Sequence, residues 1–127
     1  ADVVADVGVT RAAGVAGLCL RYQDADDYLI AYHDGTNAKL DQVVAGVTTN
    51  LRSAVATYSA GAVLRVILNG TTGLLFYNNA AVGASFTVPA SAYGVHGIYS
   101  TNTGPTLDNF VAWPRGTSGE YEALSKL

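Results

Sequence analysis

The stretch GLCLRYQDADDYLIAYHDGTNAKLDQVVAG, residues 17–46, decides the fold of this chain. It contains apolar runs of strand length, separated by polar segments rich in Asp, Gly and Asn. The runs are residues 15–23, 28–33 and 38–45, and the polar segments are 23–27 and 34–37. Asp side chains bond to nearby backbone, and Asp34-Gly35 is a preferred hairpin pair. The stretch therefore predicts three consecutive strands joined by two hairpin turns.

The rest of the chain repeats this rhythm. Further strands are predicted over residues 2–9, 49–57, 62–68, 74–77, 81–87, 93–99 and 107–113. The 62–68 run is apolar on both faces, which favours a central strand, and Asn69-Gly70 after it predicts another hairpin turn. About ten short strands with regular turns predict an all-β fold, an antiparallel two-sheet β-sandwich. We assign residues 1–114 to this module and residues 115–127 to a C-terminal tail, which holds both glutamates of the chain.

Alternation along a strand predicts which side chains share a face. In the 15–23 strand, Arg21 shares its face with small residues such as Cys19, which leaves room for something to lie over it. Tyr22 falls on the opposite face with the leucines of the same strand. In the 49–57 strand, Leu51 and Val55 are expected on one face.

Composition excludes several classes of function. The 127 residues carry a net charge of −3, with scattered basic residues, so we expect no nucleic-acid partner. No apolar run reaches the roughly 18–20 residues of a membrane span, so we expect no membrane association. Charged residues are only 13%, which suits an extracellular or assembled protein. The single cysteine, Cys19, lies in an apolar run and is expected to be a buried, inert thiol. A nucleophilic cysteine would need a histidine partner, and the sequence places neither His33 nor His96 beside it.

Five segments in order resemble a known superfamily. They are GLCLRYQDADDY (17–28), KLDQVVAG (39–46), LRVILNG (64–70), GVHGIY (94–99) and LDNFV (107–111). Their order and spacing resemble the concanavalin A-like lectin/glucanase jelly rolls, in particular the laminin-G-like modules of bacterial extracellular proteins and of phage tail or virion proteins. The resemblance covers nearly residues 2–114. It implies a concanavalin A-like jelly roll in an extracellular or virion-associated protein.

Two functions follow from this resemblance, and neither is an enzyme. Glucanases of this fold carry a Glu-x-Asp-x-Glu strand whose two glutamates act on the glycosidic bond. The only glutamates here are Glu120 and Glu122 in the tail, so we expect no catalysis. The first hypothesis is a non-catalytic glycan-binding or adhesion module that recognises a glycan or a cell-surface polysaccharide. The alternative is a structural subunit that self-assembles as a homo-oligomer, or with other chains of a filament, capsid or tail.

Sugar binding on such sandwiches needs exposed aromatic rings with planar polar groups beside them. The candidate ligand-binding residues are Arg21, Tyr32, His33, Arg65, Tyr99 and Trp113. For each aromatic residue, packing within the sandwich is the alternative. For Arg21 and Arg65, the alternative is an ion pair with Asp41 or Asp108.

Two further expectations concern calcium and the sheet edge. The carboxylates of residues 24–27, and Asp108 by the family resemblance, offer oxygen ligands for a structural calcium. The alternatives are a solvated hairpin turn and a strand-end Asp that bonds a loop amide, and we assign no cofactor. Related modules often have strands upstream of the position of Ala1, so we expect a sandwich that is trimmed, or one that another chain completes at an open sheet edge near residues 2–9.

Overall fold

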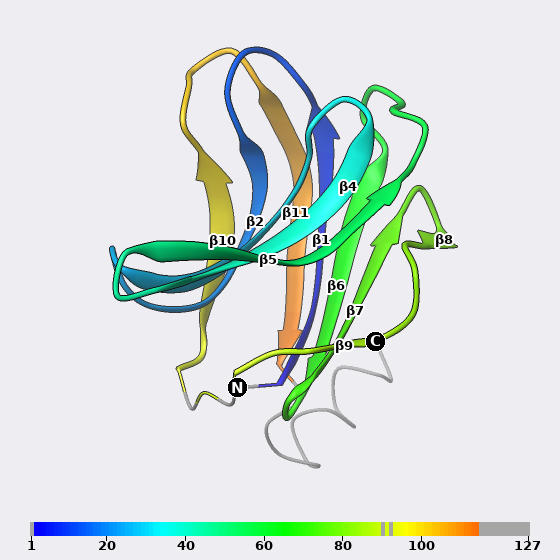
Figure 1. Cartoon of the computed structure of the whole chain (residues 1–127). Helices are drawn as coiled ribbons and strands as arrows, with labels where there is room; N and C mark the ends of the chain where they lie inside the picture. Colours follow the sequence, from blue (N-terminus) through cyan, green and yellow to red (C-terminus); the bar gives the residue numbers. More distant parts are fainter. Residues whose placement is uncertain (1, 90, 92, 115–127) are drawn as a thin grey trace.

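The computed structural model describes residues 2–89, 91 and 93–114, and it folds them into a sandwich of two antiparallel sheets (Figure 1). Sheet A contains, in spatial order, β11 (Thr106–Pro114), β1 (Val3–Thr10), β6 (Val63–Asn69), β7 (Thr72–Tyr77) and β8 (Ala80–Ala81), with β9 (Phe86–Thr87) also paired to β7. Sheet B contains β10 (Val95–Ser100), β2 (Ala16–Asp24), β3 (Asp27–His33), β4 (Asn37–Val44) and β5 (Val47–Val55). The described residues include no helix, and so none that could span a membrane. The all-β, two-sheet prediction is confirmed.

The core lies between the sheets and follows from strand alternation. Every second residue of β1, from Val3 to Val9, is buried, and β6 contributes Leu64, Val66 and Leu68 to the same cluster. Sheet B supplies mainly leucine and alanine side chains from the opposite side. Burying one such aliphatic side chain stabilises the fold by roughly 1.5–3 kcal/mol. Burial of the aliphatic side chains that this alternation places between the sheets therefore stabilises the fold.

The predicted hairpin turns at residues 23–27 and 34–37 form, and in both an Asp side chain bonds nearby backbone amides as expected. Asp24 Oδ1 accepts a hydrogen bond of 2.8 Å from the Asp26 amide. Asp34 Oδ1 accepts from the amides of Thr36 at 2.9 Å and Asn37 at 2.7 Å, and these bonds, with Lys39, lower the pKa of Asp34 to about 2. Strand β6 lies between β1 and β7, so the prediction of a central strand is also confirmed.

Two expectations about strands are wrong. Strand β1 lies inside sheet A between β11 and β6, so residues 2–9 present no open edge. The chain returns through β11 to cover that side, a long-range pairing that local patterns do not report. The 81–87 run is not one strand, because Gly83 adopts a φ of +71° and separates β8 from β9.

A bulge in sheet B changes the predicted faces of β5. The β4–β5 register shifts between Leu40 and Asp41, which leaves Leu51 as an extra residue. Beyond it the alternation inverts, so Leu51 and Ala54 pack on the core, whereas Val55 is 79% exposed. The prediction that Leu51 and Val55 share a face is therefore wrong.

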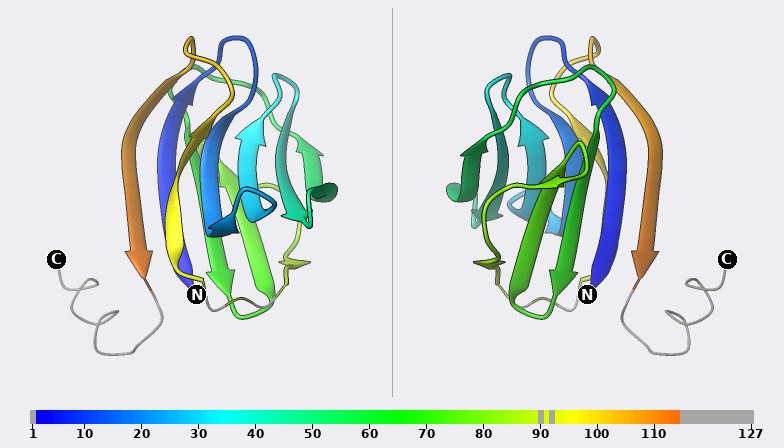
Figure 2. Two further views of the ribbon diagram at one scale, coloured as in Figure 1. Left: turned by 90° about the vertical axis from the view of Figure 1, so that its left-hand side faces the viewer. Right: turned by 90° about the vertical axis from the view of Figure 1, so that its right-hand side faces the viewer.

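Sheet B is bent, and the bend opens one end of the sandwich. The β2–β3 and β4–β5 hairpins project away from sheet A, as Figures 1 and 2 show. The segment that follows β9 crosses this end from sheet A to sheet B (Figure 1). The predicted tail, residues 115–127, lies outside the described residues.

Candidate functional site

The open end is organised by Arg21, which occupies a bulge of β2. Its φ is +48°, and the register of β2 shifts here against both β3 and β10. The extra residue turns the Arg21 side chain inward, between the sheets, where the residue is 4% exposed. The next residue, Tyr22, consequently faces outward. The predicted faces of these two residues are therefore wrong, because alternation does not continue through a bulge.

The Arg21 guanidinium joins three segments that are distant in sequence. Nη1 donates to the carbonyl of Pro89 at 2.9 Å, and Nη2 donates to the carbonyl of Gly70 at 2.8 Å. Nη2 also lies 3.5 Å from Asp2 Oδ1, which in turn accepts from the Gly70 amide at 2.7 Å. Burial lowers the pKa of Arg21, and the charge of Asp2 opposes that shift. The ion-pair partner is Asp2, so the expected pairing with Asp41 or Asp108 is wrong.

A histidine supports the bulge from β10. His96 Nδ1 accepts a hydrogen bond of 3.1 Å from the Arg21 backbone amide. Burial lowers the pKa of His96 to about 4, and the positive charge of Arg21 acts in the same direction. The imidazole is therefore neutral at physiological pH, which leaves Nδ1 able to accept.

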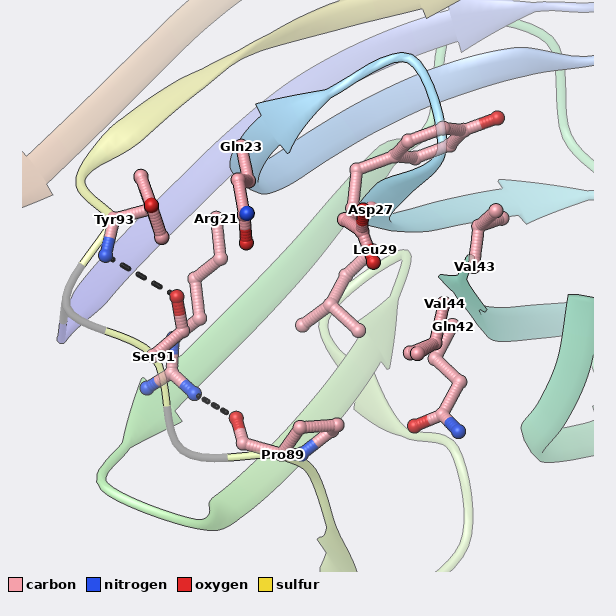
Figure 3. Close-up of a pocket in the computed structure, with 11 residues that line it drawn as sticks. Arg21, Gln23, Asp27, Leu29, Gln42, Val43, Val44, Pro89, Ser91 and Tyr93 are labelled. Atoms are coloured by element: carbon pink, nitrogen blue, oxygen red, sulfur yellow. Dashed lines mark hydrogen bonds between the residues drawn. The ribbon is translucent and has the colours of Figure 1, made fainter. Parts of the chain in front are cut away.

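A pocket of about 280 Å³ lies beside Arg21 at this open end (Figure 3). It is lined by Arg21, Gln23, Asp27, Tyr28, Leu29, Gln42, Val43, Val44, Pro89, Ser91 and Tyr93. Figure 3 shows Arg21 on one side and Gln42 on the other, with Pro89 between them. Both glutamines of the chain line this pocket. The lining therefore combines amide, carboxylate and hydroxyl groups with apolar side chains, which suits a small polar ligand with apolar faces.

A row of tyrosines, Tyr22, Tyr28 and Tyr99, lies on the outer face of sheet B. The ring centroids of Tyr22 and Tyr28 are 6.2 Å apart with an interplanar angle of 29°, and those of Tyr28 and Tyr99 are 5.9 Å apart at 30°. A hydrogen bond with Tyr99 raises the pKa of Tyr28 to about 12, with burial adding to the shift. Tyr28, the middle residue of the row, also lines the pocket.

Tyr32 and Tyr99, both predicted for ligand binding, are neighbours on this outer face. They lie on either side of Gly17, to which each is paired across the sheet. The Tyr32 hydroxyl donates to Asp41 Oδ2 at 2.7 Å, and Asn50 donates to the other oxygen of Asp41, also at 2.7 Å. Burial and the Asp41 carboxylate raise the pKa of Tyr32.

His33 lies at the opposite end of the sandwich from the pocket. It is 3% exposed, with its ring 4.6 Å from that of Tyr77 and 5.6 Å from that of Tyr58. Nδ1 accepts from the Gly35 amide at 2.9 Å, so Nε2 is the protonated nitrogen and donates to the Ala56 carbonyl at 2.6 Å. Buried and fully bonded, His33 packs in the fold.

The remaining predicted site residues, Arg65 and Trp113, belong to the outer face of sheet A. Arg65 makes a two-pronged ion pair with Asp6, with both N–O distances at 2.7 Å. Its partner is thus neither Asp41 nor Asp108, because the β1–β6 register places Asp6 directly opposite. Trp113 is paired with Val4. Of the six predicted residues, the structure brings only Arg21 to the pocket and Tyr99 to the tyrosine row, with Tyr32 close to the row.

The carboxylates considered for calcium lie in the β2–β3 hairpin and on β11. Asp24 and Asp27 each accept a backbone hydrogen bond, from Asp26 and Ala45 respectively, as turn residues. Asp108 is exposed on β11 opposite Gly8. Within the part of the chain that the structure describes, no group of three or more His, Cys, Asp or Glu residues could hold a metal ion. Cys19, predicted to be buried, is buried, and burial raises the pKa of its thiol.

Several pocket residues escaped the sequence prediction. Gln23 and Gln42 are polar residues within β2 and β4, and Ser91 and Tyr93 lie between β9 and β10. The sequence places Gln23 in a predicted turn and Gln42 in a predicted strand, and neither position carries a local signal for binding. Nothing local indicated that residues about 20 and 70 positions apart would share one cavity.

The fold matches solved structures of low sequence identity. Carbohydrate-binding module CBM66 from Bacillus subtilis gives a TM-score of 0.69 at 14% identity, over 87% of this chain and 74% of that one. Sheep galectin-11 gives 0.61 at 10% identity, over 87% and 89%. The GH43 protein BlXynB from Bacillus licheniformis gives 0.63 at 19% identity, but only 27% of that chain is covered. No protein-family model and no curated protein matches the sequence.

These likenesses establish the fold and not the ligand. The chain is a β-sandwich jelly roll of the kind found in carbohydrate-binding modules and in a galectin. The finer resemblance, to concanavalin A-like and laminin-G-like modules, stays a prediction.

Proposed function

We propose that this protein is a non-catalytic glycan-binding module whose primary site is the pocket beside Arg21. The observation that carries the proposal is the combination of two glutamine amides, a serine hydroxyl and tyrosine rings with apolar side chains in one pocket. Amides and hydroxyls can exchange hydrogen bonds with sugar hydroxyls, and apolar surface can cover the C–H faces of a sugar ring. Neighbours of the fold include a carbohydrate-binding module and a galectin, which supports the proposal.

The absence of catalysis is part of this proposal. Glycosidases generally need two carboxyl groups that flank the scissile bond. Among the described residues that line the pocket, Asp27 is the only carboxylate, and it accepts a hydrogen bond of 3.0 Å from the Ala45 amide. We place the module in an extracellular or virion-associated protein, in keeping with its low content of charged residues.

The alternative proposal is a self-assembling structural subunit. Its support is strand β5, which among the described strands pairs only with β4 and forms an edge of sheet B. Val47 and Val55 are 65% and 79% exposed on this edge, and Arg52 is the only charged residue in the strand. Exposed edge strands with few charges invite pairing with another chain.

A binding screen decides between the two proposals. The protein is applied to a glycan array, and hits are measured by calorimetry for the native chain and for Gln42→Ala. Losing one amide partner should weaken binding by about 1–1.5 kcal/mol, or roughly tenfold. Asn79→Ala is the matched control, since Asn79 lines a smaller hollow on the outer face of sheet A. An array without hits, together with a regular multimer in light scattering, would reject glycan binding in favour of assembly.

A further inference from the structure

We propose that the outer face of sheet A is a docking surface for a second copy of this chain. The two copies would pack face to face around a two-fold axis that runs along the strands, between β1 and β6. The inference does not rest on glycan binding, because no residue of this face lines the pocket beside Arg21. It also uses a different surface from β5, the edge strand of the self-assembly proposal.

The outer face of sheet A is apolar across four strands. Side chains that alternate with the core residues of β11, β1, β6 and β7 point away from sheet B. The strand register aligns them in two cross-strand rows, with Trp113, Val4, Ile67 and Leu74 in the first and Val111, Asp6, Arg65 and Phe76 in the second. The right-hand view of Figure 2 shows these four strands side by side, in front of sheet B. Because the solvated face of an antiparallel sheet is normally polar, an apolar face of this kind indicates an interaction surface.

The charges in these rows suit a second copy. Asp6 and Arg65 form one two-pronged ion pair with both N–O distances at 2.7 Å, so the two rows carry no net charge. A two-fold axis between β1 and β6 reverses the order of the strands, and it therefore places Asp6 of one copy over Arg65 of the other. Opposite charges then face each other twice, which is the complementarity that an isologous interface requires.

The shape of the face is also self-complementary. A hollow of about 140 Å³, lined by Val63, Arg65, Phe76 and Asn79, lies on the β7 side of the second row. Val111, which is 38% exposed, lies on the β11 side of the same row. The same two-fold axis places Val111 of one copy over the hollow of the other. Each copy therefore supplies both an exposed apolar side chain and the hollow that it would enter.

The extent of the face fits a small dimer interface. With about 4.8 Å between strands and a rise of about 3.4 Å per residue, four strands along the eight residues of β1 cover about 500 Å². Two copies would then bury about 1,000 Å² in total, which is at the lower limit for a specific interface. We therefore expect a weak, concentration-dependent dimer.

The native protein carries its own probe for this contact. Trp113 is the single tryptophan of the chain and belongs to the first row of the face. Sedimentation equilibrium over micromolar to millimolar concentrations should show the mass rising from that of a monomer to that of a dimer. The emission of Trp113 should shift to shorter wavelengths over the same concentrations, because dimerisation removes water from the ring.

A lysine scan of two exposed valines locates the interface. Val111→Lys should weaken association by about tenfold or more, because the lysine would lie against Arg65 of the other copy. Val55→Lys is the matched control, since Val55 is 79% exposed on β5 of sheet B, and it should leave the dimer unchanged. Circular dichroism checks that both variants fold.

A charge exchange tests the two-fold arrangement. Asp6→Arg alone should weaken the dimer, because it places two positive side chains over those of the other copy. The double variant Asp6→Arg/Arg65→Asp should restore it, because the exchange keeps the ion pair within each chain and the opposite charges between chains. A double variant as weak as Asp6→Arg would reject the arrangement.

Several results would overturn the inference and leave the glycan proposal standing. A protein that stays monomeric at millimolar concentration rejects the docking surface, and Trp113 emission already at short wavelengths would then assign the cover of this face to another part of the chain. A dimer that Val55→Lys abolishes and Val111→Lys preserves belongs to the β5 edge. If Val111→Lys does not fold, the emission of Trp113 decides, and a dimer that forms without any shift lies elsewhere.

Discussion

The two ends of this sandwich each hold a polar side chain inserted from sheet B, and the surroundings of these side chains differ. At one end, which we call the filled end, aromatic rings enclose the side chain, although Ala56 and Tyr77 there also line a hollow of about 240 Å³. At the other, which we call the hollow end, a pocket lies directly beside the side chain.

At the filled end, His33 packs between the rings of Tyr58 and Tyr77. At the hollow end, Arg21 reaches the carbonyls of Pro89 and Gly70 and leaves a pocket of about 280 Å³ beside it. Each end also has a histidine whose Nδ1 accepts a backbone amide.

The two ends of the sandwich differ in what their inserted side chains contribute, packing energy at one end and a pocket wall at the other. At the filled end, aromatic rings pack around His33, and its two ring nitrogens bond the Ala56 carbonyl and the Gly35 amide, so that end contributes packing energy. At the hollow end, the aliphatic stem and guanidinium of Arg21 span the gap between the two sheets without filling it. Substitutions should therefore cost stability at the filled end and binding at the hollow end.

The largest expected effect is at the filled end. His33→Ala removes a buried ring and two hydrogen bonds, and it should destabilise the fold by about 3 kcal/mol. Denaturant unfolding measures the loss. Glycan binding at the opposite end should persist in the fraction that remains folded. A variant as stable as the native protein would show that the contrast between the ends is not energetic.

Acid should weaken the hollow end next. The pKa of His96 is about 4 in the folded protein, against about 6.5 for an unfolded histidine. The unfolded chain therefore takes up the proton first, so stability is complete above about pH 6.5 and is lost as the pH falls toward 4. The loss should be roughly 1–2 kcal/mol, because partial exposure reduces the effect.

Unfolding free energies at several pH values across this range measure that loss. His96→Gln is the matched variant, and its unfolding free energy should fall less steeply with decreasing pH, because the contribution of His96 is removed. An identical slope in the variant would show that His96 is not the source of the acid sensitivity.

The smallest effect is expected away from both ends, at the surface ion pair of Arg65 and Asp6. Its Arg65 side chain is 45% exposed, so the pair should contribute below about 1 kcal/mol, and less at high salt. A double-mutant cycle with Arg65→Ala and Asp6→Ala, run at low and high ionic strength, measures the coupling. A coupling energy larger than the stability losses expected for His33→Ala and for acid at His96 would contradict the view that buried groups dominate the stability.

Much of the fold was predictable because it depends on local patterns. Alternation located the strands to within a few residues, and the turns at Asp24, Asp34 and Asn69 formed where Asp and Gly chemistry favours them. The site was less predictable. Arg21 was predicted as a site residue and does line the pocket, but its face and its partners were predicted wrongly. Its partners Asp2, Gly70 and Pro89 come from three distant segments.

By itself, then, the sequence determined the β-sandwich, its turns and its mainly aliphatic core, because the two-residue period of a strand and the chemistry of turns act over short distances. Only the tertiary structure decided where the bulges at Arg21 and Leu51 fall, because a bulge arises from pairing across strands. The first of these bulges turns Arg21 inward and Tyr22 outward, and both the pocket and the tyrosine row depend on that reversal.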